Sequence, residues 1–263
     1  MADEQAGRSR DSIANTLIVA ISVALVCSIL VSASAVVLRP LQLENQDLFR
    51  KRIVLEVAGL YEPGIDINTR FSAIEPRLID LETGAYSDAA DAATFDVLAA
   101  SNDPDMSIDI PPELDIANIR RRSTLAPVYV VRDGDRVEQV ILPVHGAGLW
   151  STMYGYLSVE RDGRTVRGLQ FYEHAETAGL GDQVDRPDWR AQWQGLLLFD
   201  ADGNPAVEVV RGQAPEGSPH AVDGLSGATL TGRGVMDLVR YWTGPHAFGP
   251  YLARLAREAD RNE

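Results

Sequence analysis

Cysteine is nearly absent from this chain, which has a single one, Cys27, among 263 residues. One cysteine excludes an intrachain disulfide and any iron–sulfur or zinc site built from several thiolates. Histidines are also few, and their positions show no spacing typical of metal ligands; they are His145, His174, His220 and His246. We therefore expect no protein-bound metal ion.

Positive charge is scarce as well. The chain has 24 Lys and Arg against 38 Asp and Glu, a formal net charge of −14. An acidic surface repels polyphosphate backbones, so nucleic-acid binding is not expected. The sequence also lacks a G-x-G-x-x-G loop after a strand, so no nicotinamide site is expected on this chain.

One long apolar run is present, at residues 13–38, which contain no charged side chain. As a helix, this run would extend about 39 Å, against a hydrocarbon core of about 30 Å, and it predicts a transmembrane helix. A cleaved signal peptide is the alternative, with Arg8 and Arg10 as its basic start and residues 33–35 as its cleavage site. The length of the run favours a retained anchor, while basic residues on both sides leave its orientation open.

From residue 127 onward the pattern indicates short antiparallel strands. Three turn sequences, at residues 133–134, 162–163 and 202–204, each predict a hairpin between apolar segments. The expected strands are 128–132 with 137–144, 155–160 with 165–172, and 196–200 with 206–210. Helices are expected over 41–58, with Gly59 as C-cap, and over 89–100, 187–194, 235–241 and 248–259. The predicted class is α+β, an antiparallel sheet packed by helices, after the N-terminal transmembrane helix.

The most informative segment runs from Ser226 to Thr231 and reads SGATLT. Its glycine permits backbone conformations that side chains would block. An apolar face at Val235, Leu238 and Trp242 predicts a helix that begins somewhere between residues 229 and 235. Unpaired N–H groups and the positive end of the helix dipole suit a phosphate there. An ordinary Ser/Thr helix cap is the alternative that these residues leave open.

With the preceding residues, the run DGLSGATLT resembles the D-x-x-S-G-A-T signature of FMN-binding domains in redox-driven ion pumps. It most resembles the NqrC family, whose members belong to the sodium-translocating NADH:quinone reductase. Two further segments are similar to that family: GLWSTMYGYL (148–157) and YEHAETAGLG (172–181), where the family usually has Pro in place of Ala178. Residues 241–255 also resemble the C-terminus of the family, whereas residues 60–126 carry no motif that we can place.

This resemblance implies a covalently bound FMN. In the family, a flavin transferase esterifies the last Thr of S-G-A-T with the FMN phosphate, and the matching residue is Thr229. The leading acid matches Asp223, for which recognition by the transferase is implied. The other candidate cofactor-binding residues are Ser226, Gly227, Ala228 and Thr231, with Trp150 and Leu180 as ring contacts and Ser151, Thr152, Glu176 and Thr177 as hydrogen-bond partners. No catalytic residue is expected.

The implied organisation is a cytoplasmic tail (1–12), a transmembrane helix (13–38), a helical linker and variable region (39–126) and an FMN-binding domain (127–263). The implied function is electron transfer within a six-subunit, Na+-translocating NADH:ubiquinone oxidoreductase of the bacterial inner membrane. The soluble domain would lie in the periplasm. The implied partners are the other subunits, a periplasmic flavin transferase and membrane lipid.

Two alternatives remain at this point. One is the related flavoprotein of the Rnf-type ferredoxin:NAD oxidoreductase (RnfG), which shares the attachment signature and the single anchor. The other is a non-redox, extracytoplasmic binding module that uses the fold without covalent flavin. The mass of the native protein separates this second alternative from the two flavoproteins.

Overall fold

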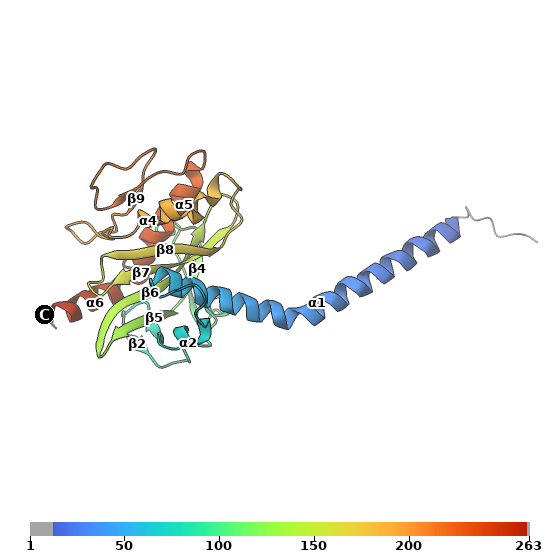
Figure 1. Ribbon diagram of the computed structural model, residues 1–263, viewed down its shortest axis with the longest axis horizontal. Coiled ribbons are helices and arrows are strands. Elements are labelled where there is room, and N and C mark those ends of the chain that lie inside the picture. Colours follow the sequence, from blue (N-terminus) through green and yellow to red (C-terminus); the bar gives the residue numbers. More distant parts are fainter. Residues whose placement is uncertain (1–12, 262–263) are drawn as a thin grey trace, which may run out of the picture. The chain divides into compact units, whose positions relative to one another are not determined.

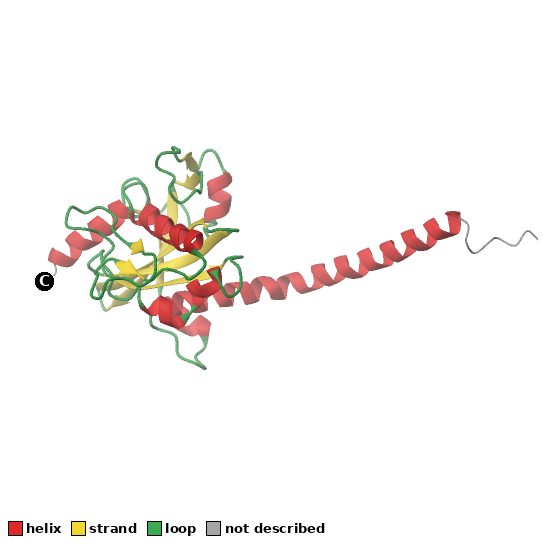
Figure 2. Cartoon of the chain, turned by 90° about the horizontal axis from the view of Figure 1, so that it is seen from above, coloured by secondary structure: helices red, strands yellow, loops and turns green. Residues whose placement is uncertain are grey.

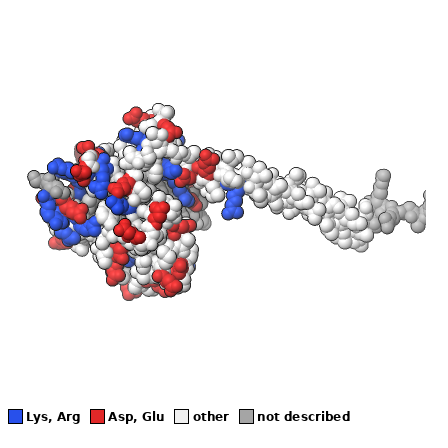
Figure 3. Space-filling view, turned by 90° about the horizontal axis from the view of Figure 1, so that it is seen from below, with Lys and Arg blue, Asp and Glu red and all other residues white. Residues whose placement is uncertain are grey.

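The computed structural model describes residues 13–261, so the expected tail at 1–12 lies outside the described residues. The chain divides into two compact units, and the boundary falls between Leu48 and Phe49. Helix α1 (Ile13–Val57) crosses this boundary (Figures 1 and 2). By length and composition it could cross a membrane, and the visible side of its first part carries no charged side chain (Figure 3). The helix continues through Pro40, where we expected two separate helices.

A six-stranded antiparallel sheet forms the centre of the second unit, in the order β2-β1-β5-β6-β7-β8. The hairpin β5–β6 turns at Gly134, which has a φ of +57°, and the hairpin β7–β8 follows it. Both hairpins, and with them the α+β class, are confirmed. The strands are β1 (Glu75–Asp80), β2 (Tyr86–Ser87), β5 (Leu125–Asp133), β6 (Arg136–Ala147), β7 (Thr152–Glu160) and β8 (Val166–Glu173).

The region between α1 and β5 contains strands as well as helices. Strand β1 pairs with β5 along its whole length, and the region therefore contributes to the central sheet. The helix expected over 89–100 is wrong, because the carboxylate of Asp96 caps a helix that begins only at Val97. The remaining elements are α2 (Ile67–Phe71), α3 (Val97–Asn102) and the antiparallel pair β3 (Ser107–Asp109) and β4 (Arg121–Ser123).

The third expected hairpin is confirmed only at its turn, where Ala206 N–H donates to the Leu198 carbonyl beside one isolated bridge between Phe199 and Pro205. The expected ladder does not extend further, because Leu197 N–H donates to the Pro219 carbonyl and Glu208 N–H to the His220 carbonyl. The chain then enters β9 (Glu208–Val209), which pairs in parallel with β10 (Ala221–Val222). This pairing places residues 208–210 beside the segment that leads into SGATLT.

Helices cover both faces of the sheet (Figure 2). The main core lies on one face and includes buried residues from α5 and α6. Val235, Leu238, Val239 and Trp242 are all buried in α5, so the apolar face expected from their spacing is confirmed. The elements on this side are the 3-10 helix η1 (Gly181–Asp185), α4 (Pro187–Ala191), α5 (Thr229–Thr243) and α6 (Gly249–Arg261).

The end of α1 packs on the other face of the sheet. Ile53 and Leu55 join a buried cluster with Ile141 and Tyr156 of the sheet. Gly59, with a φ of +69°, ends the helix as expected, because it permits bonds from its own N–H to the Glu56 carbonyl and from Leu60 N–H to the Leu55 carbonyl.

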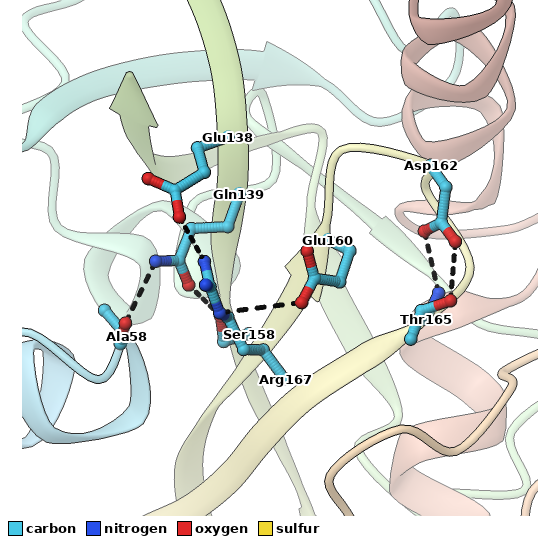
Figure 4. Close-up of polar contacts among 8 residues, drawn as sticks. All are labelled: Ala58, Glu138, Gln139, Ser158, Glu160, Asp162, Thr165 and Arg167. Atoms are coloured by element: carbon cyan, nitrogen blue, oxygen red, sulfur yellow. Dashed lines mark hydrogen bonds and ion pairs between the residues drawn. The ribbon is translucent and has the colours of Figure 1, made fainter. Parts of the chain in front are cut away.

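A buried glutamine fixes this helix end to the sheet. The Gln139 side chain donates to the Ala58 carbonyl at 2.9 Å and accepts from the Ser158 hydroxyl at 2.7 Å (Figure 4). An unpaired buried amide costs about 1–3 kcal/mol, so both contacts specify how the helix end meets strands β6 and β7.

Candidate functional site

The SGATLT segment forms the turn into α5 and the first residues of that helix. Ala228 is the N-cap residue, and Thr229 is the first helical residue. Thr229 and Leu230 are exposed, whereas Ala228 and Thr231 are buried. Gly227 has a φ of +74°, which lets the chain reverse into the helix. The Thr229 side chain is therefore presented to solvent at the positive end of a 15-residue helix.

A groove of about 750 Å³ opens beside Thr229. Its walls come from β9 and the loop after it, the segment 223–229 and the exposed side of α5. Arg211 and Arg233 contribute cationic side chains to this groove, and Glu208 and Asp223 contribute acidic ones. A volume of this order is within the range of small-molecule and cofactor sites.

Glu176 connects the three segments that resemble the family. Its Oε1 accepts hydrogen bonds from the backbone N–H groups of Leu149 and Trp150, at 3.0 and 3.1 Å. Its Oε2 accepts from the Thr231 hydroxyl at 2.5 Å. Glu176 is 8% exposed and Thr231 is fully buried. We call these contacts of Glu176 with residues 149, 150 and 231 the Glu176 clamp.

Two glycines make room for the clamp. A Cβ on Gly148 would collide with the carboxylate of Glu176. A Cβ on Gly181 would lie 2.7 Å from Glu176 Cβ and 2.9 Å from Thr231 Oγ1. Both glycines belong to the family-like segments, so their presence there is explained by the close approach of the backbone to this carboxylate.

Further hydrogen bonds hold the neighbouring loops together. Gln183 donates to the carbonyls of Leu180 and Ser226, at 2.6 and 2.9 Å. Ser151 accepts from the Ala175 N–H at 2.8 Å. A Cβ on Gly227 would lie 2.9 Å from Leu180 Cδ2, so the Leu180 side chain lies directly over the turn into α5.

Four exposed apolar side chains belong to residues next to the clamp. The exposed fractions are 69% for Trp150, 43% for Leu149, 43% for Leu180 and 58% for Leu230. We call these four residues the apolar rim. Trp150 and Leu180 are among the residues expected from the sequence, whereas Leu149 and Leu230 were missed. Their position inside the motifs GLW and ATLT is the signal that could have identified them.

The structure does not gather all the expected residues in one cavity. Ser226, Gly227, Thr229 and Asp223 line the groove, but the candidates from the other two segments do not. The side chains of Glu176 and Thr231 bond to each other in the Glu176 clamp. Thr152 and Thr177 are exposed, and the Asp223 carboxylate is bonded to Gln192 and to the Ala214 N–H.

Two histidines near these segments have shifted pKa values. The carboxylate of Asp185 accepts a hydrogen bond from His174 at 2.9 Å and raises the pKa of that imidazole. Burial lowers the pKa of His145 to about 4, where its ring stacks on Tyr154 and lies against Trp242. Among residues 13–261, no group of three or more His, Cys, Asp or Glu could hold a metal ion.

Comparison with known proteins identifies the family. The model of the FMN-binding domain family matches residues 148–244. The NqrC protein of the Na(+)-translocating NADH-quinone reductase of Vibrio alginolyticus is 49% identical over 255 residues, covering 97% of this chain and 99% of that protein. Its counterpart in Yersinia pestis is 46% identical over 260 residues, covering 97% of each chain. The chain belongs to the NqrC family of the Na(+)-translocating NADH-quinone reductase.

A solved structure of this family has the same fold. The crystal structure of Shewanella oneidensis NqrC superposes with a TM-score of 0.75 at 36% sequence identity, covering 81% of this chain and 99% of that one. The corresponding structure from Parabacteroides distasonis superposes with a TM-score of 0.65 at 26% identity, covering 82% of this chain and 96% of that one. The matched FMN-binding domain, residues 148–244, contains the Glu176 clamp, the groove and the apolar rim.

Proposed function

We propose that this chain is the FMN-carrying electron-transfer subunit of a Na+-translocating NADH:ubiquinone oxidoreductase, with FMN bound through its phosphate to Thr229. The observation that supports this most directly is the exposed Thr229 side chain at the first position of α5, inside the family's FMN-binding domain. A Thr hydroxyl is a weak nucleophile, so a separate flavin transferase attaches the cofactor.

The residues around Thr229 fit an FMN ester. The phosphodiester would keep one negative charge, which the positive end of α5 stabilises. The groove offers ample volume beside the attachment point, and the apolar rim offers exposed carbon surface for the ring. Trp150 and Leu180 are the proposed ring contacts, since Leu180 covers the attachment turn. FMN supplies the electron transfer, and the protein supplies attachment, orientation and the local electrostatic field.

The Glu176 clamp has a supporting part in this proposal. It fixes the first turn of α5 through Thr231 and fixes the backbone of the Trp150 loop through two N–H groups. Both sides of the FMN site are thereby positioned relative to each other by one buried carboxylate. Glu176 thus orients the site and is not itself required to contact FMN.

The remaining parts of the proposal concern the complex. NADH would be oxidised on another subunit of the six-subunit assembly, and sodium translocation would be a property of the whole complex. Helix α1 would be retained as the anchor in the inner membrane, with the FMN domain in the periplasm, where the flavin transferase acts. The acidic surface of the domain agrees with partners that are proteins and not nucleic acids.

The mass of the purified full-length chain tests the attachment. In a host that contains the flavin transferase and exports the domain, the mass should exceed that of the polypeptide by FMN minus one water. Thr229→Ala should abolish the increase, while Ser226→Ala, which removes a hydroxyl from the same turn, should retain it. An unmodified wild-type chain would instead favour the non-redox binding module.

A further inference from the structure

Asp223 is held at every polar atom by the protein itself. Its carboxylate accepts from the Ala214 N–H at 2.7 Å and from Gln192 Nε2 at 3.1 Å. Its N–H donates to Gln192 Oε1 at 2.8 Å, and its carbonyl accepts from Trp189 Nε1 at 2.8 Å. A residue bonded in this way is fixed in both backbone and side chain.

The groups that hold Asp223 are themselves well fixed. Trp189 is 5% exposed and packs edge-to-face on the fully buried Trp193, with ring centroids 5.6 Å apart. Gln192 is the C-cap residue of the same short helix, α4. The two donors and the one acceptor that this helix offers to Asp223 therefore come from a segment anchored in the main core.

The constraint continues into the next residue. Gly224 donates its N–H to the Gly212 carbonyl at 2.8 Å. A Cβ on Gly224 would collide with the Val210 carbonyl, so the chain passes closely beside the loop after β9. Two consecutive residues, six and five positions before Thr229, are thus fixed in place by hydrogen bonds.

We propose that Asp223 is a positioning residue for flavin attachment and that it acts together with Gln192 and Trp189. The carboxylate fixes the path of the attachment turn, so that Thr229 meets the transferase in one orientation. The transferase reads the folded turn and does not contact the carboxylate. This assignment rests on the proposed attachment of FMN to Thr229, and it replaces the recognition role that the sequence resemblance implied for Asp223.

The rate of flavin attachment is expected to depend on this positioning. Rates of group transfer depend steeply on the orientation of the attacking atom, and a displacement of about 1 Å can cost roughly 10²-fold. A Thr hydroxyl is a weak nucleophile, so its reaction depends strongly on correct orientation. Loss of the Asp223 contacts should therefore slow attachment strongly, even where the domain still folds.

Two substitutions, alone and combined, distinguish a positioning role of Asp223 from direct recognition of its carboxylate by the transferase. Asp223→Asn places a carboxamide N–H against the Gln192 N–H, so one contact is lost. Gln192→Glu places two carboxylates about as close as the present 3.1 Å contact, where they repel. In the double variant the carboxylate moves to position 192, where it accepts from the carboxamide and the N–H of position 223. The new carboxamide oxygen still accepts from the Ala214 N–H.

The experiment measures the initial rate of covalent flavin incorporation into the full-length chain in detergent, with the flavin transferase and a flavin dinucleotide as donor. The bond from Thr229 Oγ1 to the flavin phosphate forms as the pyrophosphate bond of the donor breaks, and the nucleoside monophosphate and the hydroxyl proton leave. Each single variant should be slowed at least about tenfold, in line with the sensitivity to orientation given above. The double variant should return to within about threefold of the wild type. Gln194→Glu, which adds a charge to an exposed glutamine two residues away, is the matched control and should label like the wild type.

A double variant that labels as slowly as Asp223→Asn overturns the inference, because the transferase would then require the carboxylate at position 223 itself. If melting shows that any of these variants fails to fold, Trp189→Phe replaces them. It keeps an aromatic ring but removes the bond to the Asp223 carbonyl, and unchanged labelling of this variant contradicts the inference. A wild-type chain that takes up no flavin at all refutes the proposed function instead.

Discussion

The Glu176 clamp makes a quantitative prediction about stability. Glu176→Ala removes the acceptor for three donors, the N–H groups of Leu149 and Trp150 and the Thr231 hydroxyl. A hydrogen bond to a charged group contributes about 1.5–3 kcal/mol. Trp150 is exposed, so water can replace part of the hydrogen bonding that the Leu149 and Trp150 N–H groups lose. The buried Thr231 hydroxyl, in contrast, is left without a partner. We therefore expect a loss of about 3 kcal/mol in the free energy of unfolding.

Thermal unfolding of the full-length chain in detergent, followed by tryptophan fluorescence, measures this loss. For a domain of roughly 200 residues, about 3 kcal/mol corresponds to a decrease in Tm of roughly 6–12 °C. Thr231→Val keeps the shape of the side chain but removes one donor, so it should cost about 1–2 kcal/mol. Glu173→Ala changes an exposed glutamate three residues before Glu176, at the end of β8, and should stay within about 0.5 kcal/mol.

The combined variant Glu176→Ala/Thr231→Val isolates the contact between the two side chains. Because both substitutions remove the same hydrogen bond, the double variant should be clearly less destabilised than the sum of the two single variants. Two results would refute this reasoning: additive losses in the double variant, or a Glu176→Ala protein that melts with the wild type.

Two further predictions concern pH and topology. His145 binds protons more weakly in the folded chain, with a pKa of about 4, than in the unfolded chain, with a pKa of about 6.5. Between these values the unfolded state binds more protons, so the contribution of His145 to the free energy of unfolding falls by about 3 kcal/mol as the pH decreases from 6.5 to 4. Denaturant titrations at several pH values should show that the free energy of unfolding of His145→Phe decreases less over this range than that of the wild type. The same decrease in both proteins would contradict the assignment. Because Cys27 is the single cysteine, Glu216→Cys in a Cys27→Ala background should react with a membrane-impermeant maleimide from the periplasmic side. Ser9→Cys in the same background should not react, and the reverse pattern would place the FMN domain in the cytoplasm.

The sequence predicts features whose determinants are local. The turn at Gly134 and the apolar spacing of α5 each lie within a few residues, and the structure has both. The third hairpin formed only at its turn, because the segments that would have extended its ladder bond to residues 219–222 instead, a pairing that no local pattern specifies. The pairing of β1 with β5 joins segments about 50 residues apart, and no local pattern in either strand specifies the other.

The site shows the same division. Thr229, the proposed FMN acceptor, can be identified from one short motif, because this residue and its helix start are adjacent in sequence. The contacts of Glu176 join residues 26, 27 and 55 positions away, so its side chain could equally have faced the cofactor. The bonds from Gln192 to Asp223 span 31 positions. Only the packed fold shows that these polar groups bond to each other around the turn into α5.

Fragmentation of the flavin-bearing peptide from the native, full-length chain tests the central claim most directly. The account predicts a single modified residue, Thr229, carrying FMN through its phosphate, while Ser226 and Thr231 of the same peptide are unmodified. A peptide without flavin from a host that contains the flavin transferase, or flavin on another residue, would contradict it.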